Sequence, residues 1–319
     1  MNIVTPVLEL VGSLGLLLYG MKLMSDGVQK SAGEKLQRTL SVVTSNKVVA
    51  ILTGMLITMI IQSSGATTVM VVTFVNAGLI SLAQSAGVIF GANIGTTITA
   101  WIVSIFGFNF KISAFAVPVV GLGYFLSIFK KRKYQNIGEA IMGFGLLFLG
   151  LSGLSSVFTP DQLGWMLNIK GTGASAIILG FLIGIVVTAL LHSSSAFSAI
   201  VITMAYNGLI SWELAAAMTL GSNVGSTVDS IMASMGTSAN GRRAALIHVM
   251  FNLFGTIVVL CFLKPFLDLV MFITPGQENS NIAIRISMLH TVFNIITTCV
   301  MTPLSGKLVK IAEFLIKDD

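Results

Sequence analysis

The sequence predicts an all-α integral membrane protein built from two inverted-topology repeats, with re-entrant or broken helices at the membrane midplane. Three observations support this fold class. The composition is strongly apolar, the chain repeats itself at a constant offset, and equivalent loops of the two halves carry opposite charge bias. The predicted units are residues 1–133 (first repeat), 134–280 (second repeat) and 281–319 (an additional transmembrane helix and an amphipathic cytoplasmic tail).

The composition excludes an ordinary soluble domain. Hydrophobic residues make up 55% of the 319 residues, charged residues only 9%, and the mean hydropathy is +0.93. Soluble domains carry about 25% charged residues, so this chain is predicted to lie in a membrane. Spans of about 20 apolar residues can cross a bilayer. Candidate spans are residues 3–24, 108–129, 137–157, 244–264 and 282–301, with longer interrupted tracts at 47–104 and 174–236.

Polar residues interrupt the two long tracts at matching positions. Q-S-S-G-A-T-T starts at Gln62, and H-S-S-S-A-F-S starts at His192. The offset that places Gln62 on His192 also aligns G-A-N-I-G-T-T with G-S-N-V-G-S-T, and 15 of 40 positions from Thr58 to Thr97 are identical. Such self-similarity indicates an internal duplication. Because hydrocarbon satisfies no hydrogen bond, each break must be buried in protein or face a watery cavity.

The basic residues predict that the two halves are inverted, since Lys and Arg accumulate in short loops on the cytoplasmic side. The segment after the first span holds, in or beside it, Lys22, Lys30, Lys35, Arg38 and Lys47. The equivalent segment at 155–173 holds only Lys170. Residues 130–133 are all basic, whereas the loop T-P-G-Q-E-N-S-N that ends the second half has no basic residue. This pattern predicts a multi-pass protein of the cell inner (plasma) membrane, with the N-terminus outside and the C-terminus in the cytoplasm.

Inverted repeats with broken helices are typical of secondary transporters, whose sites lie where the repeats meet. Freed N–H groups at half-helix starts attract anions, and freed carbonyls with Ser, Thr and Asn oxygens suit a hard cation such as Na⁺. The alternative is that these small polar residues only allow close helix packing. Two copies, each followed at the same distance by N-x-G-[TS]-T, favour a site. The residues alone predict a small oxyanion, which leaves phosphate, sulfate and dicarboxylates open.

The paired motifs resemble the sodium-dependent inorganic phosphate cotransporter family, the type II Na⁺/phosphate carriers and their bacterial relatives, whose signature is a duplicated Q-S-S-S motif. The resemblance covers about residues 8–301. It implies Na⁺-coupled symport of inorganic phosphate by alternating access, with Na⁺ as coupling ion and no organic cofactor. A Na⁺-coupled carrier of another small oxyanion and a non-coupled channel are the alternatives. Neither an enzymatic activity nor a nucleic-acid partner is expected, and a homo-oligomer is left open.

By position, the resemblance implies a substrate and ion region built from both halves. The substrate-binding residues implied are Ser63, Ser64, Thr67, Thr68, Ser193, Ser194, Ser195, Ser198, Asn93 and Asn223. The Na⁺ ligands implied are Gln62, Thr97 and Thr227. Asp229 joins the Na⁺ ligands because an acid inside a membrane span is a functional candidate by default.

Two positions depart from the family signature. Gly65 replaces the third serine of the first motif, and His192 replaces glutamine in the second. Histidine changes its charge near neutral pH, so His192 is a candidate pH-sensing residue.

A second repeated motif, R-x-x-x-x-H-x-x-F-N, contains His248 in its first copy and His290 in its second. These histidines are expected to form hydrogen bonds between helices rather than to act in catalysis. With three histidines in the chain and no H-E-x-x-H motif, a membrane metalloenzyme is not indicated.

Inversion of the halves makes a prediction for side-chain accessibility. In intact cells, Lys30→Cys and Lys131→Cys should react only with membrane-permeant thiol reagents, because both positions are expected in the cytoplasm. Gln277→Cys, on the opposite side, should react with impermeant reagents as well. Thiol labelling of whole cells measures this difference, and equal labelling of all three positions by an impermeant reagent would contradict the argument from charge.

Overall fold

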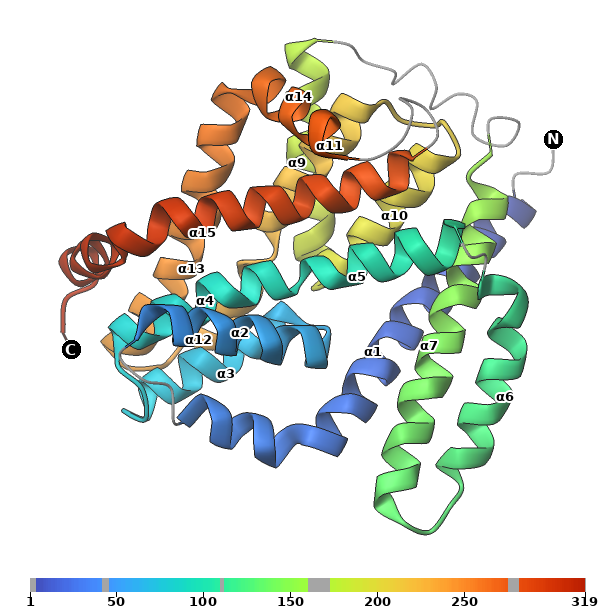
Figure 1. The fold of residues 1–319 in the computed structure, drawn as a ribbon, viewed down its shortest axis with the longest axis horizontal. Helices are drawn as coiled ribbons and strands as arrows, with labels where there is room; N and C mark the ends of the chain where they lie inside the picture. The colour runs from blue at the N-terminus through green and yellow to red at the C-terminus, as the bar shows by residue number, and fades with distance from the viewer. Residues whose placement is uncertain (1–3, 42–45, 110–111, 160–172, 275–280, 319) are drawn as a thin grey trace.

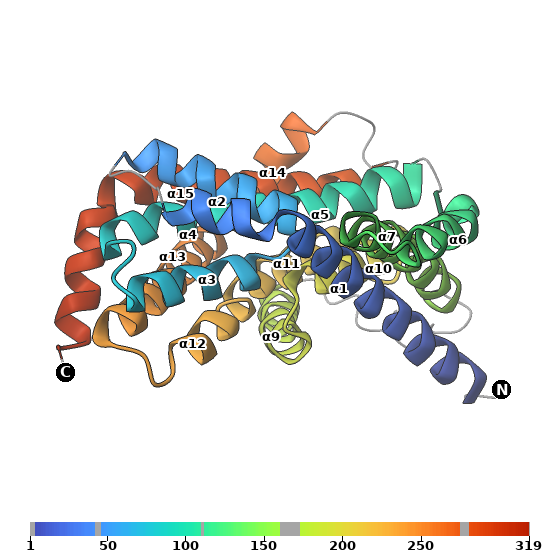
Figure 2. The ribbon, with the colours of Figure 1, turned by 90° about the horizontal axis from the view of Figure 1, so that it is seen from below.

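The computed structural model describes residues 4–41, 46–109, 112–159, 173–274 and 281–318, and every regular element in these ranges is helical. The predicted loops around 160–172 and 275–280 lie outside the described residues. In Figure 1, α6, α7 and the first part of α1 stand together at one end of the molecule, and α1 then bends and continues below α3. Figure 2, turned by 90°, shows the same grouping.

The elements of the first half are α1 (Val4–Ser41), α2 (Lys47–Ile61), α3 (Ser64–Asn76), α4 (Leu82–Gly95), α5 (Thr97–Ile102), the π-helical turn η1 (Val103–Asn109), the 3-10 turn η2 (Ile112–Phe115) and α6 (Ala116–Ser127). Those of the second half are α7 (Arg132–Val157), α9 (Ala174–Leu191), α10 (Ser194–Tyr206), α11 (Trp212–Gly225), α12 (Val228–Ser234), α13 (Ala239–Cys261) and α14 (Leu263–Ile273). The last helix is α15 (Ile282–Leu315).

Six helical segments among the described residues are long and apolar enough to cross a membrane. They are Thr5–Ala32, Leu82–Phe108, Arg132–Val157, Ala174–Leu191, Ala239–Cys261 and Ile282–Leu315. The predicted all-α membrane fold is therefore confirmed. By contrast, α3 and α10 have 13 residues each, about 20 Å of helix, which is shorter than a hydrocarbon core of about 30 Å.

The chain folds back between α2 and α3. The hydroxyl groups of Thr58 and Thr67 are hydrogen-bonded at 2.9 Å, although the same stretch of straight helix would hold them roughly 14 Å apart. Figures 1 and 2 show the two helices side by side. The first polar break is therefore the turn of a helical hairpin.

Glycines repeat the same close contacts in both halves. A Cβ atom on Gly54 of α2 would lie 2.0 Å from the Val88 carbonyl oxygen of α4, and one on Gly184 of α9 would lie 2.2 Å from that of Met218 in α11. Gly184 and Met218 are the repeat equivalents of Gly54 and Val88. Only a residue without a side chain allows these backbones to approach so closely. The duplication seen in the sequence is thus repeated in the packing of the helices.

The equivalent helices α1 and α7 pack against each other reciprocally. A Cβ on Gly20 would lie 2.4 Å from the backbone nitrogen of Leu147, and a Cβ on Gly150 would lie 2.3 Å from that of Leu17. Further along, Gly27 of α1 faces Asn136 of α7, so the two helices run antiparallel. Reciprocal contacts of this kind mark a twofold relation. An antiparallel course of equivalent spans is consistent with inverted repeats.

Two predicted helix boundaries differ from the structure. The predicted span 108–129 is wrong at its start: the preceding helical segment continues to Asn109, and α6 begins only at Ala116. The predicted first span, 3–24, also ends too early, because α1 continues to Ser41 and therefore carries Lys22 well inside it. Apolar content finds a span but does not show where one helix ends when no capping residue or proline interrupts it.

The predicted tail helix is the end of α15 rather than a separate element. This helix is 34 residues long and contains Pro303. Its ribbon turns through a wide angle toward the C-terminus (Figures 1 and 2). Proline inside a helix bends it by removing a hydrogen bond, so the amphipathic tail continues the last span in a new direction.

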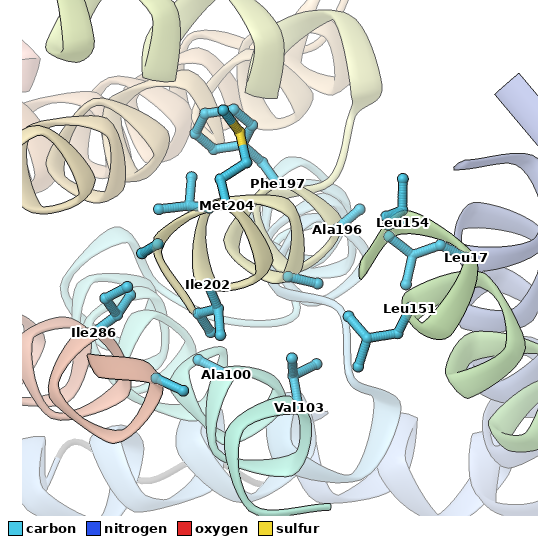
Figure 3. Close-up of a cluster of buried hydrophobic side chains, with 14 of the residues drawn as sticks. Leu17, Ala100, Val103, Leu151, Leu154, Ala196, Phe197, Ile202, Met204 and Ile286 are labelled. Carbon is cyan, nitrogen blue, oxygen red and sulfur yellow. The ribbon is translucent and has the colours of Figure 1, made fainter. Parts of the chain in front are cut away.

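Helix α10 lies at the centre of the largest apolar cluster. Figure 3 shows side chains of α1, α5, α7 and α15 around it, among them Leu17, Ala100, Leu151 and Ile286. Its own Phe197 is 2% exposed. Because α10 is enclosed on most sides, the helix that follows the second polar break is held at a defined place.

The helix contacts made by glycine predict a loss of stability on substitution. A Cβ on Gly91 would lie 1.9 Å from the Ile51 carbonyl oxygen, so Gly91→Ala should force α2 and α4 apart and destabilise the protein by about 1–3 kcal/mol, the usual effect of overpacking. Gly15→Ala is the matched control, since nothing lies within 4 Å of a Cβ there. Thermal unfolding of detergent-solubilised protein measures both; an unchanged midpoint for Gly91→Ala would contradict the proposed contact.

Candidate substrate and ion site

Both polar motifs break a helix by the same backbone device. Gln62, which ends α2, has φ 60°, and His192, which ends α9, has φ 51°. They are the two non-glycine residues with positive φ in the described part of the chain. A left-handed conformation costs a residue with a side chain about 1–2 kcal/mol. Strain of this kind is kept where the surrounding structure over-determines it, most often at functional sites.

The residue after each break caps the following helix. Ser63 and Ser193 have extended backbones, and their Oγ atoms accept hydrogen bonds from the backbone N–H groups of Ala66 and Ala196, both at 3.1 Å. Capping satisfies one of the free N–H groups of a first helical turn. The remaining N–H groups of α3 and α10 stay available to an anion.

Each break is also held by a side chain from a later helix of the same half. The Thr99 hydroxyl donates to the Gln62 amide oxygen at 2.9 Å, and His192 Nδ1 lies 2.8 Å from a carboxylate oxygen of Asp229. Thr99 and Asp229 are themselves equivalent under the offset that aligns Gln62 with His192. The two halves therefore stabilise their breaks at equivalent positions with different chemistry: a neutral pair in the first half and an ionisable pair in the second.

The two breaks open on one cavity of about 380 Å³. Its lining consists of residues 62–66, residues 191–195, Ser226, Asp229 and one face of α1. Equivalent segments of the two repeats, far apart in the sequence, thus meet at a single space. The starts of α3 and α10, with their partial positive charge, both border it.

Gly65 and Asp229 are two positions at which the repeats differ, and the two residues lie against each other. A Cβ atom on Gly65 would lie 2.4 Å from Asp229 Oδ2, so the carboxylate of the second half occupies the space that a serine side chain would need in the first. In the second motif, Ser195 stands where the first has Gly65, and Thr99 stands where the second half has Asp229. The missing serine is explained by an acidic side chain that comes from the other repeat.

Not all of the residues singled out from the sequence reach this cavity. Those that line it are Gln62, Ser63, Ser64, His192, Ser193, Ser194, Ser195 and Asp229. Those outside its lining are Thr67, Thr68, Asn93, Thr97, Ser198, Asn223 and Thr227. The second group is buried, and most of its polar atoms serve the helices that carry them. The hydroxyls of Thr68, Thr97 and Thr227, for example, donate to carbonyls three residues earlier.

The repeated histidines link helices, as predicted. His290 Nε2 of α15 lies 2.9 Å from the Asn223 amide oxygen of α11, and His248 Nδ1 of α13 lies 2.9 Å from the Ser230 hydroxyl of α12. Asn223 is thereby held from both sides, because its amide nitrogen also donates to the Thr219 carbonyl. The two bonds to Asn223 hold the N-x-G segment of the second half in place.

Helix α1 forms a third wall of the cavity, which was not predicted from the sequence. Lys22, Ser25, Asp26 and Gln29 line it together with Leu18 and Met21. Their spacing of three and four residues is that of one helix face. That spacing is visible in the sequence. The predicted first span ends at residue 24, between Lys22 and Ser25, so it divides this continuous helix face and the face is not recognised.

The composition of the cavity suits an anion together with a hard cation. Serine hydroxyls can donate or accept, and two helix N-termini favour negative charge. Carboxylate, amide and hydroxyl oxygens, which Asp26, Asp229, Gln62 and the serines supply, are the donor set of hard cations. The donors present therefore fit a Na⁺ ion beside a small oxyanion.

Residues 16–156 and 166–298 match the Na⁺/Pi-cotransporter family. The chain is 29% identical over 306 residues to the "Uncharacterized protein YqeW" of Bacillus subtilis (strain 168), a match that covers 94% of each protein. It is 28% identical over 314 residues to the "Putative inorganic phosphate export protein YjbB" of Escherichia coli (strain K12). That match covers 98% of this chain but 56% of YjbB, so the chain spans little more than half of that relative.

A more distant relative is the "Sodium-dependent phosphate transport protein 2B" of Rattus norvegicus, 33% identical over 131 residues, which are 40% of this chain and 18% of the rat protein. No solved structure matches the chain significantly. The family match extends over most of the chain and includes both broken-helix motifs. The protein therefore belongs to the Na⁺/Pi-cotransporter family, a family of phosphate transporters.

Proposed function

We propose that this protein is a Na⁺-coupled secondary transporter of inorganic phosphate that works by alternating access. One observation carries the proposal: two equivalent helix starts, Ser63–Ser64 and Ser193–Ser194, border the same cavity. Hydrogen phosphate presents both acceptor oxygens and a donor hydroxyl, and serine hydroxyls match either. The names of the YjbB and 2B relatives, which mention phosphate export and sodium-dependent phosphate transport, agree with it.

The charge of the cavity supports the proposal of sodium coupling. Asp26 and Asp229 contribute two negative charges and Lys22 one positive charge, so with neutral His192 the lining is net negative. A divalent anion would be repelled from such a space unless cations accompany it. Bound Na⁺ would supply the missing charge, with Gln62 and Asp229 as its proposed ligands at the breaks.

Alternating access is proposed from the repeat. Two halves of opposite orientation can each adopt the conformation of the other, which exposes a shared site first on one side and then on the other. In this proposal residues 1–133 and 134–280 are the two repeats, and the protein lies in the plasma membrane with its N-terminus outside. The gradients of Na⁺ and phosphate set the direction of net transport, so import and export use the same site.

Purified protein in proteoliposomes should take up labelled phosphate when an inward Na⁺ gradient is imposed. Removal of the gradient, or replacement of Na⁺ by K⁺, should reduce uptake to the level of empty liposomes. Competition by sulfate and by a dicarboxylate tests the anion. Uptake that is independent of Na⁺ would refute the coupling, and a preference for either competitor would refute phosphate as the substrate.

The two serine motifs should be equally necessary in that assay. Each of Ser63→Ala and Ser194→Ala removes the hydroxyl of a residue that lines the cavity, and a lost hydrogen bond to a charged group costs about 1.5–3 kcal/mol. Uptake should therefore fall roughly 10- to 100-fold in either variant. Ser31→Ala is the control, since its hydroxyl donates to the Gly27 carbonyl within α1 and lies outside the cavity lining. Normal uptake by Ser63→Ala and Ser194→Ala would assign the motif to helix packing.

His192 is proposed to make the Na⁺ dependence sensitive to pH. When protonated it neutralises Asp229 at 2.8 Å and opposes Na⁺, so the apparent Na⁺ affinity should fall as the pH is lowered. The other charged groups at the cavity, Lys22 and Asp26, are unchanged in His192→Gln, which should flatten this dependence. Uptake must be compared at matched concentrations of the phosphate dianion, because phosphate itself changes its charge near neutral pH. Superimposable pH profiles of wild type and variant would exclude His192 as the sensor.

A further inference from the structure

One wall of the cavity carries charged residues that the duplication does not repeat. Helix α1 presents Lys22, Ser25, Asp26 and Gln29 to the space between the two breaks. The equivalent positions in the second half are Ser152, Ser155, Ser156 and Thr159. The charged residues of α1 therefore have uncharged counterparts, and only the first half places a lysine beside the breaks.

The opposite face of α1 holds this wall in place. Gly20 and Gly27 approach the backbone of α7 so closely that a Cβ on either would lie within 2.5 Å of a backbone atom. Leu17 and Met24, on the same side of α1 as these glycines, are buried. Contact at this distance leaves α1 little freedom to rotate about its axis. Lys22 and Ser25, on the other face, are consequently directed to the cavity by helix packing and not by chance rotation.

Lys22 differs in its surroundings from Lys30, which lies further along α1. Lys30 donates to Glu139 of α7 at 2.7 Å and forms a salt bridge, and it is not part of the lining. The side chain of Lys22 is exposed and lines the cavity. Among the lining residues that the structure describes, Lys22 is the single Lys or Arg. Its ammonium group can therefore contact an anion between the breaks.

We propose that Lys22 is the anion-selecting residue of the cavity, where its ammonium group pairs with an oxygen of the bound phosphate. This inference rests on the proposed function and adds a residue that neither repeat motif contains. The serines and helix starts supply directional hydrogen bonds but no full charge, whereas Asp26 and Asp229 supply negative charge. Lys22 offsets that charge at the place where the oxyanion binds. It acts as a strongly hydrated point charge with three rotatable donors, so it favours anions without a demand for one geometry.

Uptake kinetics test this role. Lys22→Gln should raise the KM for phosphate about tenfold at saturating Na⁺, which corresponds to about 1.4 kcal/mol, with a smaller change in maximal rate. Lys22→Arg keeps the charge and should stay within about threefold of wild type. Lys30→Gln, on the same helix but outside the cavity, should match wild type. An unchanged KM in Lys22→Gln, or an equal increase in Lys30→Gln, would overturn the proposal.

A binding measurement separates this inference from the transport proposal. In protein without Cys261 and Cys299, phosphate should slow the reaction of Ser25→Cys with N-ethylmaleimide, and adding Lys22→Gln should remove that protection. Lys30→Cys is the reference position and should react at the same rate with or without phosphate. Protection without Na⁺-driven uptake would refute the transport proposal and keep the role of Lys22. Protection that survives Lys22→Gln, or no protection at Ser25→Cys, would refute the role of Lys22.

Discussion

The cavity between the two repeats depends on two helix breaks, each of which is held in a left-handed conformation. Gln62 and His192 adopt positive φ although both carry side chains, a state that needs compensation from its surroundings. Thr99 and Asp229 supply it by hydrogen-bonding the side chains of the two break residues. If either break residue left the left-handed conformation, the helix that follows would no longer start at the cavity. Its free N–H groups would then no longer point to the space that both breaks share.

Glycine contacts decide where those supporting side chains stand. A Cβ on Gly95 would lie 2.8 Å from the Cβ of Thr58, and one on Gly225 would lie 2.9 Å from that of Thr188. These glycines end α4 and α11, directly before the short helices that carry Thr99 and Asp229. Close packing of α2 on α4 and of α9 on α11 therefore sets the distance between each break and its partner. A change in the spacing of these helices would therefore move Thr99 or Asp229 relative to the break that it supports.

The two halves are similar but not identical, and two of their differences meet at one contact. Asp229 of the second half lies against Gly65 of the first, so the acid occupies space that the glycine leaves free. Helix α1 carries Lys22 and Asp26 where α7 carries serines. A symmetric framework thus holds an asymmetric set of charges. Charge, rather than backbone geometry, is where the halves of this cavity differ most.

The sequence by itself determined the membrane class, the duplication and the two break motifs, because apolar content and repeated letters are local properties of the chain. It also identified the cavity residues that lie at the breaks, since the breaks interrupt apolar tracts. It could not show that the side chains of Thr97, Thr227 and Asn93 donate to backbone carbonyls nearby in the chain instead of lining the cavity. Nor could it show that Asp229 occupies the space that a serine would need at Gly65. Those facts depend on how helices distant in sequence approach each other. Only the tertiary structure shows that the face of α1 with Lys22 lies toward the breaks. The reason is that the glycines on the opposite face pack against α7 and cover that side of the helix.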